Sequence, residues 1–143
     1  MPLTTTPLSL RMVRIIWGVA VVFAIVCIVF GGFERKTLEG GLNLRHGLLF
    51  SLAVWSALSG FSTRRRLTNR ACALASGTNP SASAKPWAAA QLVSIMSAES
   101  LVMWGLVSNT IIASPQWLSA AIYVAGVLLL FKFKPMKPSY ISL

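Results

Sequence analysis

The sequence predicts an all-α fold, namely an integral membrane bundle of four transmembrane helices with the N and C termini cytoplasmic. Hydrophobic residues make up 55% of the 143-residue chain and charged residues only 11%, a composition too apolar for the surface of a soluble domain. The apolar residues gather in four stretches, each close to the roughly 20 residues that cross a bilayer. Because only short polar connections join these stretches, we expect a single integral membrane domain over residues 1–143.

The first helix is expected over residues 15–33. This run holds 19 uncharged residues, rich in valine and isoleucine, and follows Arg11 and Arg14. It is longer than the roughly 7–15 residues of a signal-peptide apolar region, and its far end offers no A-x-A cleavage site. A first membrane helix is therefore preferred to a signal peptide.

The second helix is expected over residues 44–63. Its uncharged part, residues 47–63, spans about 25 Å at 1.5 Å per residue, slightly less than the roughly 30 Å hydrocarbon core. Arg45 and Arg64 can extend their charged ends toward the interfaces, which favours a spanning helix over a re-entrant segment. Residues 64–86 contain five cations and no acid, and we expect them to form a basic cytoplasmic loop.

The third and fourth helices are expected over residues 87–113 and 116–132. The third is a run of 27 residues with Glu99 as its only charged residue. Pro86 precedes this run, and proline is tolerated in the first turn of a helix. Trp117 anchors one end of the fourth helix at an interface, and lysines follow its other end.

The cations are distributed unevenly among the connections. Ten of the 13 lie at the termini and in the central loop, and the other three lie between the first and second helices. The positive-inside rule then puts both termini and the central loop in the cytoplasm of a bacterial cell, with the protein in the inner membrane. Four arginines of the loop are expected to contact anionic lipid head groups: Arg64, Arg65, Arg66 and Arg70.

Small residues at four-residue spacing predict where the helices pack closely. Such residues allow two backbones to approach each other in lipid. The candidates for helix packing are Ser56 and Gly60 in the second helix and Ser94 and Ala98 in the third. They indicate a compact bundle.

Glu99 is the candidate for proton or ion handling. Glu99 lies almost at the middle of its apolar run, so we expect it near the midplane of the bilayer. An ionisable group there is costly, by roughly 2.5–3.5 kcal/mol for Asp, Lys or Arg on insertion scales, and is a functional hypothesis by default. Residues one turn away offer no counter-charge, so hydrocarbon favours the neutral acid. Three interpretations stay open: a hydrogen bond that holds two helices together, a proton or ion site, and a contact with a ligand.

Other chemistry lacks support in the sequence. Cys27 and Cys72 form no CxxC pair, and His46 has no second ligand at metal-binding spacing, so we expect no metal, no cofactor and no catalytic residue. We expect His46 to be a solvated residue at an interface. The net charge of +10 does not indicate nucleic-acid binding, because the cations flank apolar segments rather than form one basic face.

Residues 92–107, with the sequence LVSIMSAESLVMWGLV, resemble the carboxylate-bearing helix of the proteolipid ring subunit of rotary ATP synthases. In that family a glutamate is followed by an apolar turn, an aromatic residue and Gly-Leu-Val. The resemblance implies that Glu99 carries a proton and that Trp104 stands where a tyrosine is usual. The second helix lacks the ring family's run of glycines, and the chain as a whole resembles small four-span membrane proteins of bacteria.

The sequence therefore predicts a small, non-enzymatic inner-membrane protein that serves as a subunit or accessory factor of a membrane complex. Its expected partners are a bilayer with anionic lipids and either other membrane subunits or further copies of itself. The alternative is a proton-coupled carrier or channel component that uses Glu99.

Overall fold

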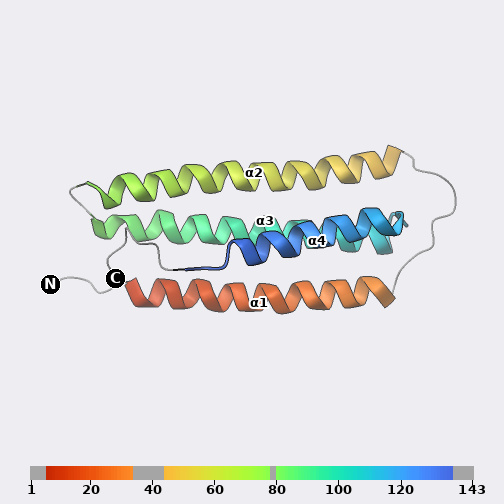
Figure 1. Cartoon of the computed structure of the whole chain (residues 1–143), viewed down its shortest axis with the longest axis horizontal. Helices are drawn as coiled ribbons and strands as arrows, with labels where there is room; N and C mark the ends of the chain where they lie inside the picture. The colour runs from red at the N-terminus through yellow and green to blue at the C-terminus, as the bar shows by residue number, and fades with distance from the viewer. Residues whose placement is uncertain (1–5, 34–43, 78–79, 137–143) are drawn as a thin grey trace.

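The computed structural model describes residues 6–33, 44–77 and 80–136, and this part of the chain is all-α, as predicted. Its elements are the helices α1 (Thr6–Phe33), α2 (Leu44–Ala75), α3 (Ala84–Thr110) and α4 (Gln116–Lys132), with a short 3-10 helix, η1 (Pro80–Ser83). The four α-helices lie side by side, and each runs opposite to the helix before it (Figure 1). The start of α1, the end of α2, the start of α3 and the end of α4 therefore face the same end of the molecule.

Helix α3 lies at the centre of the bundle and packs against α1, α2 and α4. Small residues permit this, since Ala90 and Ala98 are completely buried. The largest buried apolar cluster joins α1, α3 and α4 through residues that include Cys27, Val102 and Tyr123. Every neighbour of α3 thus buries apolar surface on the same helix.

The predicted end of the second helix at residue 63 and the predicted loop over residues 64–86 are wrong. Helix α2 continues to Ala75, and only residues 76–83 separate it from α3. The reason is local: the twelve added residues include arginines, alanines and leucines, which are good helix formers, and no glycine or proline occurs before Gly77. The predicted helix ended at residue 63 because charged residues follow it. Charged residues can end an apolar span, but they do not end a helix.

The other helix bounds differ less from those predicted. Helix α1 begins at Thr6 rather than residue 15, and Pro7 in its first turn is compatible with helix. Helix α3 covers residues 84–110 instead of 87–113. Helix α4 has the predicted bounds of 116–132.

The turn between α3 and α4 explains why α3 ends early. Ala113 has a φ of 54°, a left-handed conformation that costs a residue other than glycine about 1–3 kcal/mol. The backbone N–H of Ser114 donates to the carbonyl oxygen of Ser108 at 2.9 Å, and the hydroxyls of Ser108 and Ser119 are 3.0 Å apart. These bonds reverse the chain within a few residues and join the two helices at the turn.

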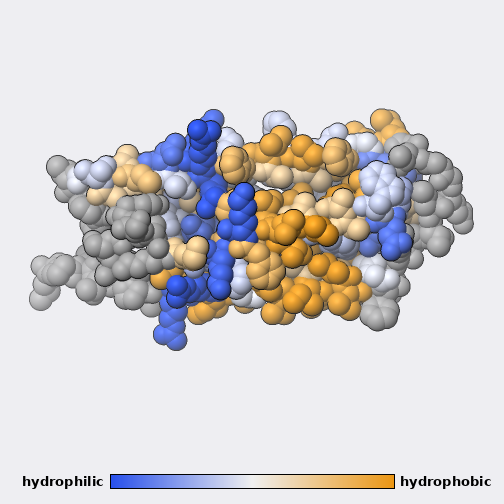
Figure 2. Space-filling model, viewed as in Figure 1, coloured by the Kyte–Doolittle hydropathy of each residue, from blue (hydrophilic) through white to orange (hydrophobic). Residues whose placement is uncertain are grey.

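Within the part of the chain that the structure describes, two helices are long and apolar enough to cross a membrane: α1, over Leu10–Gly32, and α3, over its full length. Helix α4 is apolar but shorter, with 17 residues. Figure 2 shows that apolar side chains cover one broad zone of the surface and that a band of hydrophilic side chains crosses the molecule beside it.

Candidate functional site

Four cations come together where α1, α2 and the end of α4 meet, and we call them the cation ring. Two of them meet at one aromatic side chain: the Arg64 guanidinium carbon lies 3.8 Å from the centre of the Phe133 ring, and the Lys132 ammonium lies 5.9 Å from it. These contacts bring α2 to the end of α4. The members of the cation ring are Arg14, Arg64, Lys132 and Lys134.

Helix α1 joins the cation ring through the segment that follows α4. The Arg14 Nε donates a hydrogen bond to the carbonyl oxygen of Pro135 at 3.4 Å, and the Lys134 ammonium lies 5.7 Å from the centre of the Trp17 ring. The Trp17 indole N–H donates to the carbonyl oxygen of Leu130 at 2.8 Å. Because Leu130 belongs to the last turn of α4, its carbonyl has no partner further along the helix, and Trp17 caps it.

The four arginines predicted to bind head groups all lie on α2, where they have two different surroundings. Arg65, Arg66 and Arg70 are exposed, and Arg64 is half-buried. The guanidinium of Arg64 packs over Phe133 and so contributes to the contact between α2 and α4 as well as to the surface charge.

Glu99 is half-buried, and its two carboxyl oxygens are completely buried. Neither oxygen has a hydrogen-bond partner among the described residues. The carboxyl lies close enough to the Cys27 thiol of α1 for an electrostatic interaction, so it is near the contact between α1 and α3. That contact consists of apolar side chains, among them Ile95 and Val102, which flank Glu99 on its own helix.

The position of Glu99 along the long axis of the bundle can be inferred from the residues that line a small pocket at the cation ring. Ser94 and Ser97 of α3 line this pocket together with Arg64 and Phe133. Glu99 is two to five residues further along α3 than these serines, which is about 3–8 Å at 1.5 Å per residue. The carboxyl is therefore much nearer to the cation ring than to the other end of α3 at Thr110.

Three of the four residues considered for helix packing, Ser56, Gly60 and Ala98, lie beside another helix. A Cβ added at Gly60 would overlap the side chain of Ser97, and the Trp104 indole N–H donates to the Ser56 hydroxyl at 3.3 Å; both contacts join α2 to α3. Ser94 is buried, and its hydroxyl donates to the Ala90 carbonyl of the same helix at 2.8 Å.

Ala98 lies at the closest approach between α3 and α4. A Cβ added at Gly126 would be 3.0 Å from the Ala98 carbonyl oxygen and 3.1 Å from the Val102 backbone nitrogen. The sequence analysis did not identify Gly126. A glycine between apolar residues in a short helix was an available signal, because glycine in a membrane helix marks close packing.

Tyr123 was also missed, and it joins three helices. Its hydroxyl donates to the Cys27 carbonyl of α1 at 3.4 Å, and its ring occupies the space beside Gly105 of α3. The Tyr123 hydroxyl and the Asn109 amide both lie beside Gly31. Only the tertiary structure brings these groups together, since they come from three different helices.

His46 is buried, with 4% of its surface exposed, and is not the solvated residue that we expected. The reason is its position on α2, where it is one turn before the buried Leu49 and on the same side of the helix. Within the described residues, no three side chains of the histidine, cysteine, aspartate and glutamate types group together as metal ligands.

Comparisons with known proteins leave these residues without a counterpart: no family model matches the chain, and neither does any curated protein or solved structure.

Proposed function

We propose that the protein crosses a bacterial inner membrane four times and acts as a non-enzymatic subunit or accessory factor of a membrane complex. The observation that carries this proposal is the apolar zone beside the cation ring, to which all four helices contribute large exposed side chains. Val19, Trp55, Met103 and Leu128 are examples from α1 to α4, with exposed fractions of 42–72%. Patches of this kind mark contact with lipid or with other proteins.

The dimensions of this zone support the proposal. On α1 it extends from Arg14, in the cation ring, to Gly32, which is 18 residues or about 27 Å. This length is close to the roughly 30 Å of a hydrocarbon core. The cation ring then lies at the cytoplasmic interface, where the positive-inside rule requires it, and the ends of α2 and α3 extend beyond it.

The role as a subunit follows from how little of the chain is left outside this zone. Among the described residues, the parts beyond the cation ring are the last eleven residues of α2, the first turns of α1 and α3 and the short segments next to them. These parts are highly charged on α2 and provide little surface for a soluble partner. We therefore expect partner proteins to contact the apolar faces of the helices within the bilayer.

Thiol labelling of intact cells tests the proposed orientation. Cys72 is exposed beyond the cation ring and Ile111 is exposed at the other end of the bundle, whereas Cys27 is buried. We expect a membrane-impermeant maleimide to label an Ile111→Cys variant and not the wild-type protein, which retains Cys72. Labelling of Cys72 in intact cells, without labelling at position 111, would contradict the orientation.

Cross-linking in membranes followed by purification in a mild detergent tests the proposed role. We expect the chain to be recovered in a stoichiometric complex with other membrane subunits or with copies of itself. The control is the same purification after solubilisation in a denaturing detergent, which removes partners that are not cross-linked. Recovery of only uncross-linked single chains from membranes would refute the accessory-subunit proposal.

One observation favours a second function, in which Glu99 carries a proton as part of a carrier or channel. A role in holding helices together requires a hydrogen bond from the carboxyl, and the Glu99 oxygens have none among the described residues. The residues that resemble the proteolipid helix include this glutamate. Its short distance from the cation ring would also give it a shorter path to the cytoplasm than a residue at the midplane would have.

Two substitutions at Glu99 distinguish the proton-carrying role from the bundle-stabilising role. A buried polar group without a partner costs free energy, so replacing it with an apolar side chain of similar size is neutral or stabilising. We expect Glu99→Leu and Glu99→Gln to keep the bundle intact and to abolish proton flux in proteoliposomes, measured with a trapped pH dye. We also expect a hydrophobic carbodiimide, which reacts with protonated carboxyls, to modify Glu99. Loss of the fold in Glu99→Leu would eliminate the proton-carrying role. Full proton flux in Glu99→Gln, together with no carbodiimide adduct at Glu99 of the wild-type protein, would eliminate it as well.

A further inference from the structure

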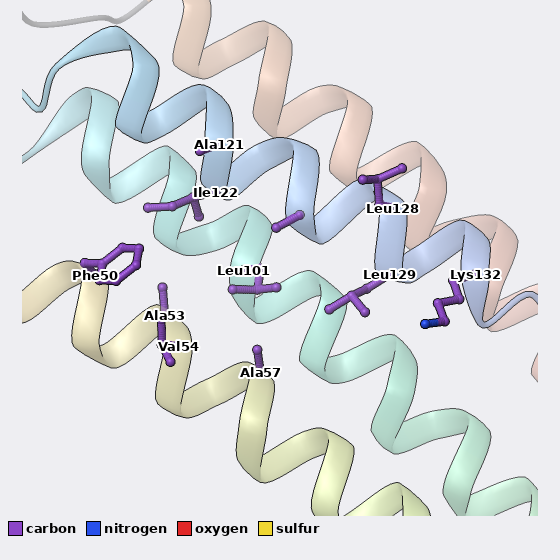
Figure 3. Close-up of a pocket in the computed structure, with 11 residues that line it drawn as sticks. Phe50, Ala53, Val54, Ala57, Leu101, Ala121, Ile122, Leu128, Leu129 and Lys132 are labelled. Atoms are coloured by element: carbon purple, nitrogen blue, oxygen red, sulfur yellow. The ribbon is translucent and has the colours of Figure 1, made fainter.

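An apolar groove runs between α2 and α4, with α3 as its floor (Figure 3). Its volume is about 530 Å³, within the range of roughly 300–1,000 Å³ that is usual for ligand pockets. The groove exists because both walls contain alanines, which leave the space between the two helices unfilled. These alanines are Ala53 and Ala57 on α2 and Ala121 and Ala125 on α4.

The lining of the groove is apolar except at one end. Leu101 of α3 lies on the floor, and Phe50 and Leu128 lie on the two walls (Figure 3). Among the described residues of the lining, Lys132 is the single charged one, and it belongs to the cation ring. Lys132 makes no ion pair with any described residue, because the only acid in the described part of the chain is Glu99, on the contact between α1 and α3.

A second cation is located close to this charged end. Arg64 lines the small pocket at the cation ring, which shares Ala57 and Leu129 with the groove. Arg64 and Lys132 both approach the Phe133 ring, so they come from opposite walls to the same end of the groove. An occupant with a negative charge at one end and an apolar remainder would match this arrangement.

The length of the groove along the bundle indicates which amphiphile fits it. From Ala121 to Lys132 it follows 11 residues of α4, or about 16 Å, which is half of the roughly 30 Å hydrocarbon core and so the depth of one leaflet. The groove therefore has the depth over which one acyl chain of that leaflet extends.

We propose that this groove binds one acyl chain of an anionic phospholipid from the leaflet at the cation ring, with the lipid phosphate next to Lys132 and Arg64. The proposal depends on the membrane location proposed above and adds a defined lipid site to it. The acyl chain fills the space left by the alanines, and the phosphate supplies a negative charge next to Lys132, which has no acidic partner among the described residues.

Native mass spectrometry of the full chain tests the lipid site, with dioleoylphosphatidylglycerol and dioleoylphosphatidylcholine as probes because they share acyl chains and differ in charge. We expect the wild-type protein to retain one phosphatidylglycerol in preference to phosphatidylcholine. A basic residue near anionic lipid contributes about 1 kcal/mol, so Lys132→Gln should reduce this preference about fivefold. Ala125→Phe, which fills the groove, should abolish retention of both lipids.

Two variants serve as matched controls. Lys134→Gln removes a member of the cation ring that does not line the groove. Ala120→Phe adds a phenylalanine at an exposed position of α4 that does not line the groove. Both should bind lipid like the wild type. Equal retention in the wild type, Lys132→Gln and Ala125→Phe would overturn the proposal. Loss of a dimer rather than of lipid in Ala125→Phe would also overturn it and identify a second copy of the chain as the occupant.

A measurement on the unchanged protein removes any dependence on how the variants fold. Phosphatidylglycerol with a photoreactive acyl chain should cross-link to the peptides of α2 and α4 that line the groove, and adducts confined to α1 would refute the site. Alkaline extraction of the same membranes tests the location separately. Protein that is released by alkali contradicts the membrane location, whereas protein that stays in the membrane without groove adducts contradicts the lipid site alone.

Discussion

The closest approach between α3 and α4 gives a direct test of the packing, through the substitution Gly126→Ala. The added methyl group would be 2.9 Å from Val102 Cγ2, 3.0 Å from the Ala98 carbonyl oxygen and 3.1 Å from the Val102 backbone nitrogen. Two of these atoms belong to the backbone of α3, so the change cannot be accommodated by a side-chain rotation. Helix α4 must move away from α3.

The magnitude follows from two opposing terms. Overpacking of a close contact costs about 1–3 kcal/mol, and replacement of glycine by alanine within a helix recovers roughly 0.5–1 kcal/mol of conformational free energy. We therefore expect a net loss of about 1 kcal/mol from the free energy of unfolding, within a range of about 0–2.5 kcal/mol. Gly18→Ala is the matched control, because a Cβ at Gly18 would have no atom within 4 Å and only the stabilising term applies.

The buried thiol of Cys27 provides the assay. The Tyr123 hydroxyl of α4 donates to the Cys27 carbonyl oxygen, so separation of α4 from the bundle exposes this part of α1. In a Cys72→Ser background, which removes the exposed thiol, the rate of maleimide labelling reports the population of opened molecules. A loss of about 1 kcal/mol corresponds to labelling about fivefold faster than in the parent.

Gly18→Ala in the same background should label no faster than the parent protein. Equal labelling rates for Gly126→Ala and Gly18→Ala would show that the α3–α4 contact is not as close as described. That result would refute the argument from packing, because the two substitutions differ only in the space around the added methyl group.

Three further predictions concern contacts near the ends of the helices. Trp17→Phe removes the hydrogen bond to the Leu130 carbonyl and should lower the free energy of unfolding by about 0.5–1.5 kcal/mol, measured by the same labelling of Cys27. Arg64→Gln removes the guanidinium that packs over the Phe133 ring and should lower the melting temperature in detergent, whereas the exposed Arg65→Gln should leave it unchanged. Ala113→Gly relieves the left-handed backbone at φ 54° and should raise that temperature; a decrease would contradict the described turn.

The sequence by itself determined the features that depend on local composition. Apolar stretches separated by polar connections indicated an all-α chain with four helices, and the bounds of α4 followed from the proline before it and the lysine-rich segment after it. The spacing of small residues identified Gly60 and Ala98 as contact positions, because each lacks a bulky side chain where another helix approaches. These signals lie within one segment and can be read without knowledge of the partner segment.

The tertiary structure alone decided which groups share a level and which remain without a partner. The uncharged run around Glu99 suggested a central position, but the small pocket that Arg64 and Phe133 line together with serines of α3 puts the carboxyl near the cation ring. Hydropathy could not reveal this, because the first turns of α3 are apolar and yet lie beyond the ring. The groove that ends at Lys132 likewise exists because α2 and α4 both pack on α3 with a space between them. The distance between two helices depends on how they pack and cannot be predicted from the sequence of either helix.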